Sequence, residues 1–93
     1  MTNDSKIIDS FQKDFIFHIY PNPIDGIIKI STSENSSVIY FNIINPQGQI
    51  IKKGELIFNG QSSTLDISSL SKGIYIIELS NKIFVETHKL VLK

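Results

Sequence analysis

Residues 37–57 read SVIYFNIINPQGQIIKKGELI, and this stretch decides the fold class of the chain. Two runs rich in β-branched and aromatic residues flank the turn Asn45-Pro46-Gln47-Gly48, whose residues preset φ or accept a positive φ. Alternation places Ile39, Phe41 and Ile43 on one face of the first run. The stretch therefore predicts a β-hairpin with one apolar face.

The same alternation of strand-like runs and turn signals continues from Phe15 to the end of the chain. The runs recur at roughly 8 to 12 residues, a spacing typical of an all-β sandwich or barrel. Isoleucine is abundant and alanine is absent, which favours strands over helices. Asn59-Gly60 indicates a second tight hairpin turn. The seven expected strands are Phe15–Tyr20, Gly26–Ser31, Ser37–Ile44, Gln49–Ile57, Ser63–Ile67, Ile74–Leu79 and Phe84–Leu92.

Alternation also assigns the faces of most of these strands. The side chains expected to point inward are Phe15, Phe17, Ile19, Ile28, Ile30, Ile39, Phe41, Ile43, Tyr75, Ile77 and Leu79. Val38, Tyr40, Ile74 and Ile76 fall outside this core and indicate either a docked partner or simply an isoleucine-rich composition. We favour the second interpretation, because isolated apolar side chains are common on protein surfaces.

The last run, Phe84–Leu92, has no clean inside and outside. Both of its faces mix polar and apolar residues, with Glu86 and His88 in line with Leu90 on one of them. A bulge, or a strand end gripped on both faces, would explain this pattern.

Length and composition exclude several classes of protein. A chain of 93 residues is one domain that buries about 60 to 65 % of its unfolded surface. Nine lysines balance nine carboxylates, and the absence of arginine argues against a nucleic-acid partner. Cysteine is absent, so there is no disulfide framework or thiolate metal site. No apolar run approaches the ~20 residues needed to span a bilayer, so membrane insertion is not expected.

The chemistry-bearing residues do not suggest an enzyme. The two histidines, His18 and His88, are expected to be surface residues of strands, and the carboxylates are scattered without an acid/base pair. Asp25 and Asn22 offer two oxygens, well short of the six to eight that calcium takes. We therefore expect no catalytic residues, no metal site and no cofactor.

The N-terminal residues differ from the rest of the chain. Residues 1–14 mix charges with isolated apolar side chains and predict a linker or tail, whereas residues 15–93 form the domain. The polar start, Met1 to Lys6, leads into no apolar segment of signal-peptide length. We therefore expect no export signal in this sequence as written.

Three groups of residues follow one another along the chain. The first is a rigid turn after the first strand, the second is LDISSLSKGIY at residues 65–75, and the third is KLVLK at residues 89–93. With the turn at Asn45–Gln49 between them, they resemble the type A C-terminal sorting domain of the type IX secretion system of Bacteroidetes. The motif positions are Tyr20, Pro21, Asn22, Pro23, Gly26, Gly48, Leu70, Gly73 and Tyr75. Asn45 stands where that family often has aspartate.

The resemblance, which covers about residues 15–93, implies an immunoglobulin-like β-sandwich of about seven strands and a function as an address label. Such a domain is fused behind a cargo protein, which reaches the periplasm by a separate export signal. The partners it implies are the type IX shuttle and translocon, which carry the cargo to the cell surface or medium, and a sortase that removes the domain. The sortase junction is expected within about residues 1–14.

The resemblance also implies that the terminal segment is recognised by the secretion machinery. Its residues are Lys89, Leu90, Val91, Leu92 and Lys93. We expect recognition of a strand at a sheet edge, where lysines flank an apolar stretch. The other two motifs are expected to specify the fold without touching a receptor.

A carbohydrate-binding or adhesive β-sandwich is the alternative function. Sugar platforms need exposed aromatic side chains, and Tyr40 is the obvious outward candidate in a chain without tryptophan. A purely structural cap on a multidomain protein is a third possibility.

Overall fold

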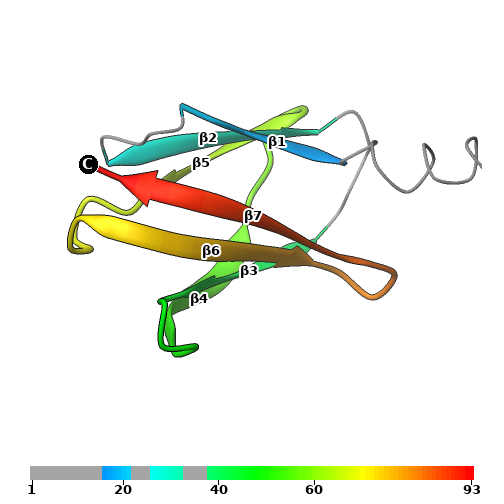
Figure 1. The fold of residues 1–93 in the computed structure, drawn as a ribbon. Helices are drawn as coiled ribbons and strands as arrows, with labels where there is room; N and C mark the ends of the chain where they lie inside the picture. Colours follow the sequence, from blue (N-terminus) through cyan, green and yellow to red (C-terminus); the bar gives the residue numbers. More distant parts are fainter. Residues whose placement is uncertain (1–15, 22–25, 33–37) are drawn as a thin grey trace, which may run out of the picture.

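The computed structural model describes residues 16–21, 26–32 and 38–93, which form seven β-strands (Figure 1). Each boundary lies within two residues of its expected position, and the expected all-β class is confirmed. The strands are β1 (Phe17–Tyr20), β2 (Ile27–Thr32), β3 (Ile39–Ile44), β4 (Ile50–Leu56), β5 (Ser62–Asp66), β6 (Gly73–Ser80) and β7 (Val85–Leu92).

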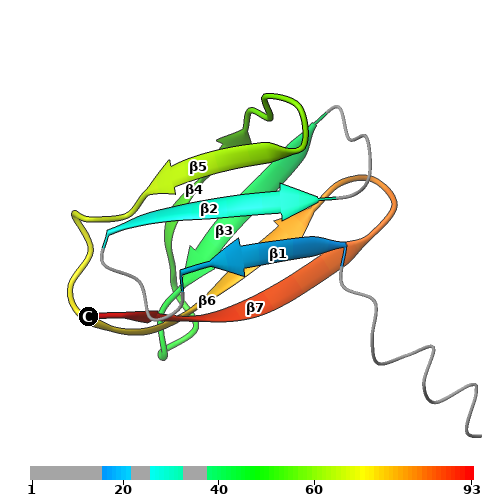
Figure 2. The same cartoon turned by 90° about the horizontal axis from the view of Figure 1, so that it is seen from above.

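The strands form two antiparallel sheets that lie one above the other (Figures 1 and 2). One sheet has the order β1-β2-β5 and the other has the order β4-β3-β6-β7. This is the immunoglobulin-like arrangement, except that the fourth strand belongs to the second sheet instead of the first. The expected β-sandwich is therefore confirmed.

The core lies between the two sheets and follows the expected alternation. Phe17, Ile28 and Ile30 of one sheet face residues such as Ile43 and Ile77 of the other, and all five are fully buried. Ile19 is half-buried and packs against this core. The complete buried apolar set among the described residues is Phe17, Ile28, Ile30, Ile39, Phe41, Ile43, Leu56, Ile67, Tyr75, Ile77, Leu79, Leu90 and Leu92.

The turn between β3 and β4 has the expected hairpin geometry. The Gly48 N–H donates to the carbonyl of Asn45, and Gly48 has a φ of 85°, which favours glycine. The register between the strands shifts after Ile43, so Ile44 pairs with Ile50 and Ile51 is the extra residue. The predicted hairpin therefore contains a β-bulge next to its turn.

The tight turn predicted at Asn59-Gly60 is present, with an isolated antiparallel bridge between Asn59 and Ser62, but the strands that it joins do not pair. The turn is closed by a bond from the Asn59 N–H to the carbonyl of Ser62. However, β5 pairs with β2, so the strands on either side of the turn belong to different sheets. Phe58 packs against the core there, 6.1 Å from Phe17 between ring centroids, and carries the chain from one sheet to the other.

Several expectations fall on residues outside the described ranges. They are the linker at residues 1–14, the inward position of Phe15, and the motif and candidate calcium residues Asn22, Pro23 and Asp25. Within the described ranges, no helix is long and apolar enough to cross a membrane, and no three potential metal ligands cluster together.

Candidate functional site

β7 carries the segment that the sequence singles out for recognition. It forms one edge of the four-stranded sheet and pairs along its full length with β6, from Val85 opposite Ser80 to Leu92 opposite Gly73. The pairs follow one another without a shift in register. The bulge suggested for this strand is therefore absent, and the strand alternates regularly between two faces.

The five segment residues divide between those two faces. Leu90 and Leu92 point into the core and are buried, whereas Lys89 and Lys93 are exposed and Val91 is half-buried. Alternation places Lys89 and Val91 together on the outer face of the sheet. Two side chains thus fix the segment to the domain, and the other three lie outside the core.

Glu86 explains why the inward face of β7 begins with polar residues. Its Oε1 accepts a hydrogen bond from the Ile16 N–H at 2.8 Å, and its Oε2 accepts one from the Phe17 N–H at 3.0 Å. The Nε2 atom of His88 lies 2.6 Å from the same Oε2. The carboxylate therefore joins the last strand to the start of the first, and His88 is part of that contact, not the surface residue expected from the sequence.

Replacing Glu86 with alanine is expected to lower the free energy of unfolding by about 2 kcal/mol, because two backbone N–H groups lose their acceptor. Urea denaturation of the purified domain measures this change. Glu55→Ala, at an exposed position of β4, is the control and is expected to change stability by less than about 0.5 kcal/mol. Equal effects of the two substitutions would contradict the assigned role of Glu86.

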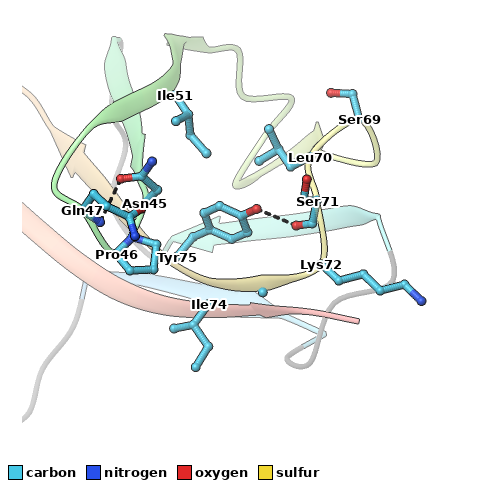
Figure 3. Close-up of a pocket in the computed structure, with 11 residues that line it drawn as sticks. Asn45, Pro46, Gln47, Ile51, Ser69, Leu70, Ser71, Lys72, Ile74 and Tyr75 are labelled. Carbon is cyan, nitrogen blue, oxygen red and sulfur yellow. Dashed lines mark hydrogen bonds between the residues drawn. The ribbon is translucent and has the colours of Figure 1, made fainter.

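The second motif closes one end of the sandwich. Tyr75, near the start of β6, donates a hydrogen bond to the carbonyl of Ser71 (Figure 3). This is the tyrosine corner of immunoglobulin-like folds, in which a tyrosine at the start of the sixth strand bonds back to the preceding loop. Leu70 of that loop is half-buried and packs against the core. The motif therefore fixes the path of the chain into β6.

A hollow of about 470 Å³ opens beside Tyr75 at this end. It lies between the β3–β4 turn and the β5–β6 loop, with Ile51, Leu70 and Tyr75 pointing toward one another across it (Figure 3). The Asn45 side chain at its rim accepts bonds from the backbone of Gln47 and Gln49 and donates to the Gln49 side chain. Asn45 thus accepts the backbone hydrogen bonds expected of the aspartate that the family often has at this position.

The first motif contacts the second through Gly26. The Ile67 N–H donates to the Gly26 carbonyl at 2.7 Å. Gly26 has a φ of 136°, and a Cβ atom there would lie 3.1 Å from the Cβ of Ser68, so both conformation and space require glycine. Because Gly73 pairs with Leu92, the second motif contacts the third in turn. The start of β2, the start of β6 and the end of β7, which carry described residues of the three motifs, lie at the same end of the sandwich (Figure 1).

Asp66 shapes the loop of the second motif. Its Oδ1 accepts bonds from the hydroxyl of Ser68 at 2.6 Å and from the Ser68 N–H at 2.9 Å. These two bonds hold the pKa of Asp66 below its usual value of 3.8, and the bond from the hydroxyl has the larger effect.

The ionised form of Asp66 is therefore expected to stabilise the fold above about pH 3.8, and this contribution is lost as the pH falls through the lower pKa of the folded state. An NMR titration of the carboxyl carbon measures that pKa. Ser68→Ala is expected to raise it toward 3.8. An unchanged pKa in that variant would refute the role of the hydroxyl.

Comparison with known families agrees with this arrangement. The model of a family described as "Secretion system C-terminal sorting domain" matches residues 18–93, which include all seven motif positions that the structure describes. A search of curated proteins found no match. The fold and the match together define a secreted-protein targeting module, and the family is not known for enzymatic activity.

The chain belongs to the family of type IX secretion C-terminal sorting domains. It is a sorting signal, which implies that it engages the type IX machinery as the C-terminal tag of a cargo and that the cargo is exported to the cell surface or the extracellular space.

Proposed function

We propose that the folded domain presents Lys89, Val91 and Lys93 to the type IX machinery, while Leu90 and Leu92 hold them in place. The observation that carries this proposal is the division of one five-residue segment between the core and the outer face of β7. Unfolding the segment would expose two leucines and empty their sites in the core. The receptor is therefore expected to read the folded sandwich and not an extended peptide.

The proposed route begins in the periplasm. A cargo fused in front of the domain folds there, a shuttle and the outer-membrane translocon bind the domain, and a cell-surface sortase then removes it. We place the linker and the sortase junction in residues 1–14 and the sorting domain in residues 15–93. β1 begins at the end of the sandwich opposite to the end where β7 finishes (Figure 1). Cleavage before β1 is thus compatible with a partner bound at the recognition segment.

The carbohydrate-binding alternative has less support. Tyr40 is half exposed and lines a hollow whose other lining residues are Val38, Asn81, Lys82 and Ile83. None of these four offers a second aromatic ring that could form a sugar platform with Tyr40. The family match independently favours the sorting function.

A fusion tests the proposed function. Residues 15–93 are placed behind a fluorescent protein that carries its own export signal, in a bacterium with a working type IX system. Fluorescence is expected in the medium or on the cell surface, whereas the same protein without residues 15–93 stays in the periplasm. Periplasmic retention of the full fusion would overturn the proposal.

A further inference from the structure

We propose that the recognition surface extends from β7 across the whole four-stranded sheet, as an apolar patch that docks an apolar, carboxylate-rimmed surface of the secretion machinery. We call this surface the outer-face patch, and its residues are Ile44, Ile50, Ile74, Ile76 and Val91. The inference rests on the proposed function, because it names further residues and the partner chemistry of the same recognition event.

Strand pairing makes the patch continuous. Ile50, Ile44 and Ile76 lie directly opposite one another on β4, β3 and β6, and Ile74 lies opposite Val91 on β6 and β7. Directly opposite residues have Cβ atoms about 4.5 to 5.5 Å apart, so their side chains touch. The patch therefore includes a residue from every strand of the sheet.

The patch faces away from the core. Its members alternate with buried residues along their strands, as Ile74 and Ile76 do with Tyr75 and Ile77. Ile74 is 51 % exposed, Ile76 is 37 % exposed and Ile50 is also exposed, while Ile44 and Val91 are half-buried. Adjacent exposed apolar side chains of this kind mark interaction surfaces more often than isolated ones do. The patch occupies the half of this face at the end where β7 finishes, and the exposed apolar side chains of the other half include Tyr40 and Val85.

Charges around the patch indicate the chemistry of the partner. Lys89 continues the row of Ile50, Ile44 and Ile76 onto β7. Lys72 directly precedes β6 and Lys93 directly follows β7, and all three lysines are exposed. An apolar surface with carboxylates at its rim would complement this arrangement.

On the outer face of the four-stranded sheet, the described carboxylates lie on the half that does not carry the patch. Glu78 is one row away from Ile76 and accepts a hydrogen bond from the Asn42 side chain at 2.9 Å. Glu55 lies opposite Tyr40, one row further on. The described carboxylates of this face therefore lie away from the patch, on a half that also carries Lys53 opposite Asn42.

A second copy of the domain is a poorer occupant. A two-fold symmetric contact would place the same patch on both sides and gather the lysines of both copies around one interface. β1 begins at the end of the sandwich opposite to the end where β7 finishes (Figure 1). These two observations favour a separate partner over a dimer or the attached cargo.

The test uses the fluorescent fusion with substitutions on either half of the outer face. Ile74→Glu and Ile76→Glu are expected to reduce secreted fluorescence by about tenfold or more, given the contribution of one buried isoleucine to binding. The matched controls, Tyr40→Glu and Val85→Glu, are on the same face at positions that are 50 % and 64 % exposed, and they are expected to retain secretion. A double Ile74→Thr, Ile76→Thr variant keeps β-branched side chains and is also expected to lose secretion.

The melting temperature of each purified domain shows whether a variant is misfolded or is folded but unable to dock. Normal secretion of folded patch variants, or equal losses in patch and control variants, would overturn the inference. So would dimerisation of the purified wild-type domain that Ile74→Glu abolishes, because the patch would then bind a second copy. If the wild-type fusion itself stays in the periplasm, the proposed function fails and not the patch alone.

Discussion

Replacing Leu90 with alanine is expected to lower the free energy of unfolding by about 3 kcal/mol, the usual result of truncating a buried leucine. Leu90 is fully buried, although it lies in the middle of the recognition segment. Chemical denaturation of the purified domain measures the loss. A fusion that carries this variant is expected to be secreted poorly because its domain is partly unfolded.

Val91→Ala is the matched control, since Val91 is half-buried on the outer face of the same strand. Its effect on stability is expected to stay below about 1 kcal/mol. A similar loss of stability in both variants would refute the division of the segment into anchoring and presented residues. Deleting residues 90–93 cannot separate these roles, because it removes two core side chains together with the presented ones.

Reversing the charge of Lys89 and Lys93 together, by Lys89→Glu and Lys93→Glu, is expected to abolish secretion of the fusion without unfolding the domain. Both lysines are exposed, so stability is expected to change by less than about 0.5 kcal/mol per substitution. Glutamates at the rim of the interface would repel the carboxylates of the partner, which opposes both encounter and binding. Secreted fluorescence and urea denaturation are measured on the same variant.

The control for this experiment reverses two other exposed lysines. Lys53→Glu and Lys82→Glu cause the same change in net charge away from the recognition segment. This variant is expected to be secreted normally. If both charge-reversed fusions lost secretion to the same degree, net charge and not the terminal segment would control export.

Most of the fold could be predicted from the sequence because its signals are local. Alternation along β3 and β6 assigns their inward residues, and the Asn45-Pro46-Gln47-Gly48 turn joins two strands that do pair. Asn59-Gly60 carries an equally strong turn signal, yet its flanking strands lie in different sheets. Turn chemistry determines how the chain reverses but not which strand the next one joins.

The faces of β7 could not be assigned from the sequence for a different reason. Glu86 and His88 break the apolar pattern because the carboxylate binds backbone N–H groups of Ile16 and Phe17, about seventy residues earlier. A sequence pattern does not reveal backbone partners at that separation. Glu86 and His88 lie at intervals of two residues from Leu90 and Leu92, and this spacing was the signal that they face inward.

The sequence predicted the candidate site only in part. Sequence reasoning selected residues 89–93 as one unit, but only the structure separates the buried leucines from Lys89, Val91 and Lys93. It also treated Ile74 and Ile76 as a consequence of composition. Pairing across four strands gathers these residues with Ile44, Ile50 and Val91, and pairing depends on topology that the sequence does not encode locally.

The most direct test of the sorting function compares two otherwise identical bacterial strains, one with the type IX translocon and one without it. Both express the exported fluorescent protein fused to residues 15–93, and fluorescence outside the cells and in the periplasm is measured in each. We expect external fluorescence only in the strain with the translocon and periplasmic accumulation in the other. Equal external fluorescence in the two strains, or none in either, would contradict a type IX sorting function for this domain.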